Sequence, residues 1–196
     1  MVSQEHSHRR PAVRLATFFV LLALALGISL IFGVAPKPPK TVRPPTDGGR
    51  TRTTYVYDGD TIQVEGRHKV RLLGIDAMDS HNERRMMDQA RQLGMTPLQV
   101  RKWSRRARKH LQKVVENEVV RLRYGPERTD DYGRLLAYIF RVSGKREVDV
   151  NADLVARGLA TATRRFSHPR REEFIRLEHE AREDNRGLWK DATRVP

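Results

Sequence analysis

The sequence has 196 residues, a length that suits one compact domain once an apolar N-terminal stretch is set aside. Lysine and arginine outnumber aspartate and glutamate by 38 to 24, and the resulting formal net charge of +14 favours polyanionic partners such as nucleic acid or anionic lipid. Cysteine is absent, which excludes disulfides, thiolate zinc sites and a cysteine nucleophile. Any metal must therefore be held by oxygen or histidine, and the histidine spacing supports no zinc site.

The N-terminal part predicts a membrane segment. Residues 15–35 carry no charged side chain, and a helix of this length roughly matches a hydrocarbon core of about 30 Å. They follow a basic tail at residues 1–14. The small residues at 33–35 are typical of a signal-peptidase site, so a cleaved export signal stays open beside an uncleaved anchor. We expect the domain to lie outside the cytoplasm, either anchored to the membrane or secreted.

A proline-rich, basic segment separates this stretch from the domain. Residues 36–52 combine prolines with basic residues and glycines, a composition that favours extended backbone without a core of its own. This segment is predicted to be a linker. The domain is expected at residues 53–190, with a short tail at residues 191–196.

Period-two alternation marks the start of the domain. Tyr55 and Tyr57 precede a turn at residues 58–60, Ile62 and Val64 follow it, and an apolar run occupies residues 70–75 after a glycine-containing turn. Short alternating segments joined by such turns are typical of a β-meander. The first part of the domain is therefore predicted to be antiparallel sheet.

Helical signals follow the meander. Thr96 as N-cap, Pro97 at the first helical position and Gln99 form a capping box, which predicts a helix that ends near Asn117. A further helix is expected at residues 83–93, inside the segment 80–95. Later strands are predicted at residues 119–124 and 135–142, and later helices at residues 150–157 and 169–185. Together the elements predict an α+β domain, mainly β, with helices packed on one side.

Five short motifs occur in one order along the domain. They are Val56–Thr61, Val70–Ala77, Asp130–Ile139, Asn151–Ala160 and Gly187–Trp189. In this order they closely resemble the signatures of the staphylococcal nuclease (thermonuclease) family, over residues 53–190. The resemblance implies a five-stranded OB-type barrel with three helices, here preceded by the transmembrane segment and the linker. It also implies hydrolysis of phosphodiester bonds with one calcium ion.

A hard cation needs oxygen ligands, and two carboxylates from neighbouring strands can supply them. Asp60 and Asp76 are the candidates from the sequence. The resemblance implies the same pair and adds the backbone carbonyl of Ala77 as a third ligand. Asp58 competes as a residue that only shapes the turn, because aspartate side chains hydrogen-bond to the turn backbone. We therefore expect Asp58 to support Asp60 without binding the metal.

Phosphodiester cleavage also needs cationic groups around the phosphate. Guanidinium groups stabilise the charged equatorial oxygens through paired, planar hydrogen bonds that lysine cannot reproduce. Arg71 lies in an otherwise apolar strand, so it is expected to have an acidic or phosphate partner. Arg134 is distinguished from other surface arginines by its place in the Tyr-Gly-Arg motif. Both are predicted to be catalytic.

The expected base departs from the family pattern. The family has glutamate in a D-[AT]-P-E motif, whereas residues 76–79 here read Asp-Ala-Met-Asp. Asp79 stands in the position of the glutamate with an arm one methylene shorter, and Glu83 is the alternative acid. General-base catalysis needs about 2.6–3.2 Å between heavy atoms, or one bridging water. Asp79 is predicted to be the base.

Substrate binding is expected to differ from the family as well. Arg164 and Phe166 occupy positions where the family has tyrosines, so Phe166 is predicted to stack on a base and Arg164 to contact phosphate, with a core role open for Phe166. Asp131 stands where the family commonly has a basic residue. The segment 80–95 is longer than the family's loop and is expected to shape access to the site.

The sequence thus predicts a calcium-dependent endonuclease for DNA, with RNA open as a second substrate, acting as a monomer. The alternative is a barrel that binds nucleic acid without efficient cleavage. A membrane-surface adaptor that uses the basic linker is a third hypothesis, but it leaves Asp60 and Asp76 without a role.

Overall fold

The computed structural model describes residues 43–163 and 168–193. The predicted N-terminal tail, the membrane segment and residues 36–42 of the linker lie outside these residues, as do Arg164 and Phe166. Over the part that is described, none of the helices has the length and apolar character needed to cross a membrane. Residues 44–196 form a compact unit of their own.

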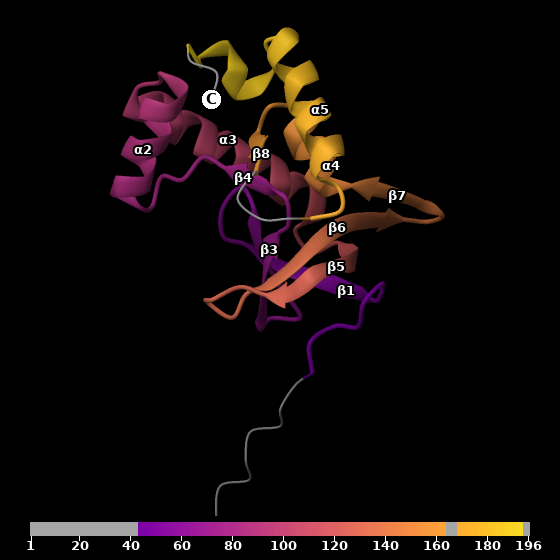
Figure 1. The fold of residues 1–196 in the computed structure, drawn as a ribbon. Coiled ribbons are helices and arrows are strands. Elements are labelled where there is room, and N and C mark those ends of the chain that lie inside the picture. The colour runs from indigo at the N-terminus through magenta and orange to yellow at the C-terminus, as the bar shows by residue number, and fades with distance from the viewer. Residues whose placement is uncertain (1–42, 164–167, 194–196) are drawn as a thin grey trace, which may run out of the picture. The chain divides into compact units, whose positions relative to one another are not determined.

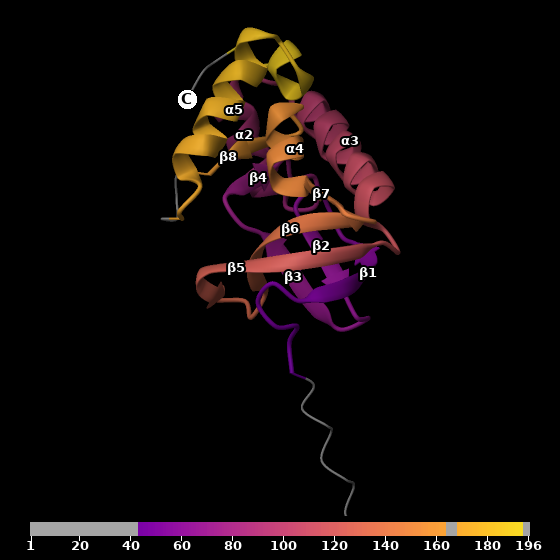
Figure 2. The same cartoon turned by 90° about the vertical axis from the view of Figure 1, so that its right-hand side faces the viewer.

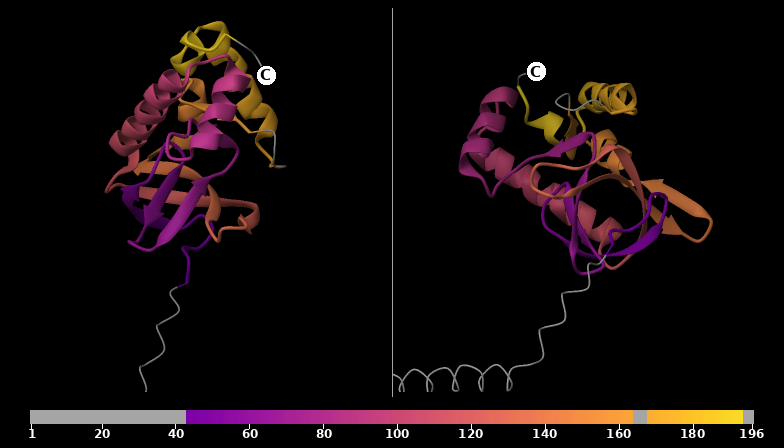
Figure 3. Two further views of the ribbon diagram at one scale, coloured as in Figure 1. Left: turned by 90° about the vertical axis from the view of Figure 1, so that its left-hand side faces the viewer. Right: turned by 60° about the horizontal axis from the view of Figure 1, so that its bottom comes forward.

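A curled sheet of six strands forms one part of this unit (Figure 1). Its order is β3-β2-β1-β5-β6-β7, and β3 also pairs with β6 in parallel, so the sheet curls back on itself (Figure 3, right). The strands are β1 Arg50–Val56, β2 Thr61–Val64, β3 His68–Leu72, β5 Val119–Thr129, β6 Leu135–Ser143 and β7 Arg146–Asp149.

The alternation in the sequence explains the inner face of the sheet. Val56, Ile62, Val64 and Val70 are all fully buried, and their neighbours along each strand are more exposed. Side chains alternate between the two faces of a strand, so a period-two pattern places the apolar set on one side. The antiparallel register of β2 with β3 keeps these apolar residues on the same face.

Four α-helices lie beside the sheet in the described residues: α2 Glu83–Leu93, α3 Pro97–Val115, α4 Val150–Ala156 and α5 Arg171–Glu183. Helices α3, α4 and α5 gather on one side of it (Figure 2), and α2 packs beside α3. The predicted capping box of α3 is present, with Thr96 accepting from the Gln99 N–H. A second, two-stranded sheet joins β4 Ile75–Ala77 to β8 Ala160–Ala162, and a 3-10 turn, η1 Gly187–Lys190, follows α5.

The α+β, mainly β class is confirmed, but the predicted five strands and three helices are a six-stranded curled sheet and four described α-helices, and several boundaries move. Strand β1 begins at Arg50, because Gly48 N–H donates to the Leu122 carbonyl (2.8 Å) and Thr51 pairs with Val120. Part of the predicted linker therefore packs on the domain. Strand β5 continues beyond the predicted Tyr124 to Thr129. The short strands β4, β7 and β8 were not expected as separate elements.

Candidate active site

Two carboxylates and one guanidinium form the centre of the candidate site. Asp60 comes directly before β2, Arg71 lies in β3 and Asp76 lies in β4. Arg71 Nη1 lies 2.8 Å from Asp60 Oδ2, and Arg71 Nη2 lies 2.7 Å from Asp76 Oδ1. The Arg71 side chain is only 13% exposed, so the acidic partner expected for it from the sequence is present twice over.

The turn before β2 fixes the position of Asp60. Its Oδ2 accepts the Ala77 N–H at 2.7 Å, and its own N–H donates to Asp58 Oδ1 at 3.0 Å. Between the two acids, a Cβ on Gly59 would lie 2.6 Å from the Ala77 side chain and 2.7 Å from that of Ala107. Glycine therefore allows the turn to press against β4 and α3. Asp58 holds the turn, as expected.

Burial disfavours the ionised forms of Asp60 and Asp76. Burial raises the pKa of Asp60 from 3.8 to about 6, with a further rise from Asp58, against the lowering effect of Arg71. Burial likewise raises the pKa of Asp76, again opposed by Arg71 and increased by Asp60. Two desolvated carboxylates that repel each other favour additional positive charge between them.

Helix α2 contributes two further polar side chains. Arg85 pairs with Asp76 Oδ1, and its Nε lies 3.7 Å from Asp79 Oδ2. Gln89 is buried and donates to the Ala77 carbonyl at 3.2 Å, while its Oε1 accepts the Asp79 N–H at 2.8 Å. The segment predicted only to shape access is thus bonded directly to Asp76.

These groups open onto a pocket of about 700 Å³. Its wall includes Arg71, Asp76, Arg85, Gln89 and Arg134. Arg134 Nε donates to Asp130 Oδ2 at 2.7 Å, so its guanidinium is oriented by the turn that precedes β6. Three arginines and six acidic residues from separate segments share one concave surface, which is suited to a cation and a phosphate together.

The chain matches the family model described as staphylococcal nuclease homologue over residues 69–191. It belongs to the staphylococcal nuclease family. The family predicted from five motifs is therefore confirmed, and the matched region contains β3 from Lys69 onward, β4 and all four described α-helices.

Curated relatives of this nuclease-family chain come from archaea and bacteria. An uncharacterised protein of Methanocaldococcus jannaschii is 32% identical over 70% of the chain and 70% of the relative. An uncharacterised endonuclease of Escherichia coli is 30% identical over 74% of the chain and 80% of the relative. Endonuclease YhcR of Bacillus subtilis is 26% identical over 69% of the chain, but the match covers only 11% of that protein.

The family implies a calcium ion, and the donors around Asp60 suit one. Carboxylate and carbonyl oxygens are the ligands that calcium prefers, and burial already disfavours the two negative charges. The described residues contain no group of three or more histidine, aspartate or glutamate side chains placed to hold a metal. The fit therefore rests on Asp60 and Asp76, while Gln89 bonds to the Ala77 carbonyl that is expected to be the third ligand.

The structure brings some of the predicted residues into the pocket and leaves others at its edge. Arg71, Asp76 and Arg134 line the pocket together. Asp60 is not among the described lining residues, but it is paired with Arg71, which is. Asp79 is not part of the described lining. Its Oδ1 accepts the backbone N–H groups of His81 and Asn82, at 2.7 and 3.2 Å, because it closes the turn into α2.

The alternative base is no better placed. Glu83 lies in the first turn of α2, is exposed, and is absent from the described pocket wall. Arg85 and Gln89 were not among the site residues predicted from the sequence. For Gln89 the sequence held a partial signal. It is a polar residue on the helix face that also contains Met86, Ala90 and Leu93, and a buried polar side chain needs a partner.

Proposed function

We propose that the protein is a calcium-dependent endonuclease that hydrolyses phosphodiester bonds of DNA, with RNA as a second substrate, on a barrel of the staphylococcal nuclease type. The observation that carries the proposal is the bridge from Arg71 to Asp60 and Asp76, in a pocket shared with Arg134. In this arrangement the acids can bind a cation and the arginines can bind a phosphate. A membrane-surface adaptor does not need this combination.

In this proposal Asp60 and Asp76 hold one calcium ion, which when bound polarises the phosphate and lowers the pKa of water. Arg71 and Arg134 donate paired hydrogen bonds to the equatorial phosphate oxygens, where negative charge accumulates. Arg71 must exchange Asp60 and Asp76 for the phosphate, and Arg134 must exchange Asp130. Asp79 accepts the proton of the attacking water through Oδ2, since Oδ1 is bonded to the backbone.

Two further points belong to the proposal. Two relatives bear the name endonuclease, which supports the reaction class. We also propose that residues 15–35 export the domain, either as an anchor or as a cleaved signal, and that the domain acts as a monomer. Arg164 and Phe166, in the segment between β8 and α5, are proposed to contact the nucleic acid.

One observation favours a second function, nucleic-acid binding without efficient cleavage. Asp79 is one methylene shorter than the family's glutamate, and one of its oxygens is used by the turn into α2. A base that cannot reach its water within about 3.2 Å would slow hydrolysis while leaving binding intact.

Digestion of single-stranded DNA by the full-length chain in mild detergent tests the choice. Calcium-dependent cleavage is expected, with loss of cleavage in chelator and in both Asp60→Asn and Arg134→Ala. Arg101→Ala, an exposed change on α3, is the matched control and is expected to cut normally. Intact DNA that is still bound by the wild type would reject the nuclease and support the binding module.

A further inference from the structure

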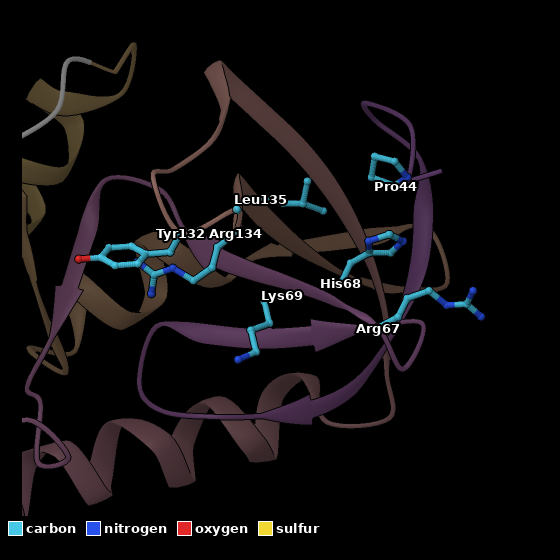
Figure 4. A pocket seen from close by; sticks show the side chains of 8 residues that line it. Pro44, Arg67, His68, Lys69, Tyr132, Arg134 and Leu135 are labelled. Carbon is cyan, nitrogen blue, oxygen red and sulfur yellow. The ribbon is translucent and has the colours of Figure 1, made fainter. Parts of the chain in front are cut away.

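A second, smaller hollow of about 340 Å³ lies beside the proposed active site (Figure 4). Its basic lining makes it a basic groove. The groove and the catalytic pocket share Tyr132 and Arg134 as lining residues, so one continuous surface leads from one to the other. Its full lining is Pro44, Arg67, His68, Lys69, Tyr132, Gly133, Arg134 and Leu135.

The charges of the groove are all of one sign. Arg67, in the turn before β3, and Lys69, in β3, are exposed, and within the described chain neither forms an ion pair with a carboxylate. Arg67 Nε donates to the Glu65 carbonyl at 3.1 Å, and Lys69 Nζ lies 4.7 Å from the centre of the Tyr57 ring. No acidic side chain belongs to the described lining, so no carboxylate of the lining repels an anion that enters the groove.

Tyr132 forms the ridge between the groove and the pocket. Its side chain projects from the turn before β6, the residue is 85% exposed, and the Arg134 guanidinium lies 5.6 Å from its ring centre. The turn itself is well defined, because Asp130 Oδ1 accepts the N–H groups of Tyr132 and Arg134 at 3.0 and 2.9 Å. A solvent-facing aromatic ring on a fixed turn beside a basic groove is the kind of surface that single strands use, since bases stack while phosphates follow the positive charge.

We propose that the basic groove binds the phosphodiester backbone of the single-stranded nucleic acid as it leaves the catalytic pocket, with Arg67 and Lys69 contacting phosphates beyond Tyr132. The site rests on the proposed function, because it places a second stretch of the same substrate. It predicts a preference for strands long enough to occupy the pocket and the groove together. Very short oligonucleotides would fill only the pocket.

The test is the salt dependence of binding, measured by fluorescence anisotropy with labelled oligothymidylates in chelator. The full-length chain is compared with Arg67→Ala/Lys69→Ala and with Arg101→Ala/Arg105→Ala, which removes the same charge from the exposed face of α3. Each phosphate contact on a single strand contributes about 0.7 to the slope of log affinity against log salt. The groove variant is therefore expected to lose about 1.4 from this slope, and the α3 variant close to nothing.

Oligonucleotide length sharpens the test. The wild type is expected to gain affinity with strand length, whereas the groove variant loses most of this gain and still binds the shortest strands as the wild type does. A groove variant with the wild-type slope would overturn the proposal, and so would equal losses in both double variants, which would mean only general charge attraction. Because binding is measured without cleavage, a protein that fails to cut DNA but passes this test would refute the nuclease and keep the groove.

Discussion

The catalytic pocket and the basic groove both present arginine side chains, but the pocket lining also has six acidic residues and the groove lining has none. In the pocket, Arg71 and Arg85 are engaged with Asp76, and Arg134 is engaged with Asp130. In the groove, Arg67 and Lys69 are exposed and have no carboxylate partner among the described residues. Paired, partly buried charges hold a fixed geometry, which chemistry needs, while free cations provide attraction that tolerates many positions. The two regions should therefore respond differently to the same substitution.

The largest difference is expected for arginine-to-lysine changes. Arg134→Lys keeps the charge but loses the planar pair of donors, so kcat on single-stranded DNA should fall by about 100- to 1000-fold. Arg67→Lys, the matched change in the groove, should alter kcat and KM by less than about twofold, because a phosphate there needs only charge. Initial rates at saturating calcium measure both. Similar losses in the two variants would erase the distinction between pocket and groove.

Removing the buried charge of Asp60 should stabilise the fold while abolishing cleavage. The folded state raises the pKa of Asp60 from 3.8 to about 6, so between these values it holds more protons than the unfolded chain. Stability due to this group is therefore highest below about pH 4 and falls as the pH rises through about 6. Asp60→Asn should raise the free energy of unfolding in chelator by up to about 3 kcal/mol at pH 8.

Urea unfolding of wild type and Asp60→Asn at several pH values measures this effect. The gain should disappear well below pH 4, where Asp60 is protonated in both states. A groove variant such as Lys69→Gln is the comparison, since an exposed cation should change stability little at any pH. A destabilised Asp60→Asn at pH 8 would mean that the ion pair with Arg71 outweighs the cost of burial.

Replacing Arg85 is expected to strengthen calcium binding, although Arg85 lines the candidate active-site pocket. Its guanidinium is paired with Asp76, so it opposes any cation that binds the same carboxylate. Arg85→Gln should therefore increase calcium affinity by about tenfold, as measured by isothermal titration calorimetry. Arg84→Gln, which removes an equal charge from the adjacent exposed position on α2, should change the affinity far less. Weaker calcium binding in Arg85→Gln would instead assign Arg85 to holding Asp76 in place.

Arg85 also marks the limit of what the sequence could predict. The meander, the capped helix α3, the pairing of Arg71 with acid and the family all followed from short-range patterns or ordered motifs. The position of Gln89 against Ala77 depends instead on how α2 folds back over β4, which is a long-range packing result. The same holds for β4 and β8, which are three residues each and pair across more than eighty positions.

The start of the domain was misplaced for a related reason. Proline, glycine and basic residues at 36–52 indicate extended backbone, but extended backbone also pairs readily with a sheet. Tyr124 O–H donates to the Pro45 carbonyl at 2.8 Å, and its N–H donates to Asp47 Oδ1 at 2.9 Å. These contacts depend on β5, which lies far along the chain, so local composition could not reveal them.

The smallest expected effect is that of Tyr132, which lines both the pocket and the groove. Tyr132 is 85% exposed, so Tyr132→Ala removes little packing and should leave the melting temperature and calcium affinity unchanged. If its ring stacks on a base, binding of a long oligothymidylate should weaken by about fivefold. The salt slope should stay the same, because no phosphate contact is lost. Tyr132→Phe keeps the ring and should bind as the wild type, whereas equal losses in the two variants would point to the hydroxyl and away from stacking.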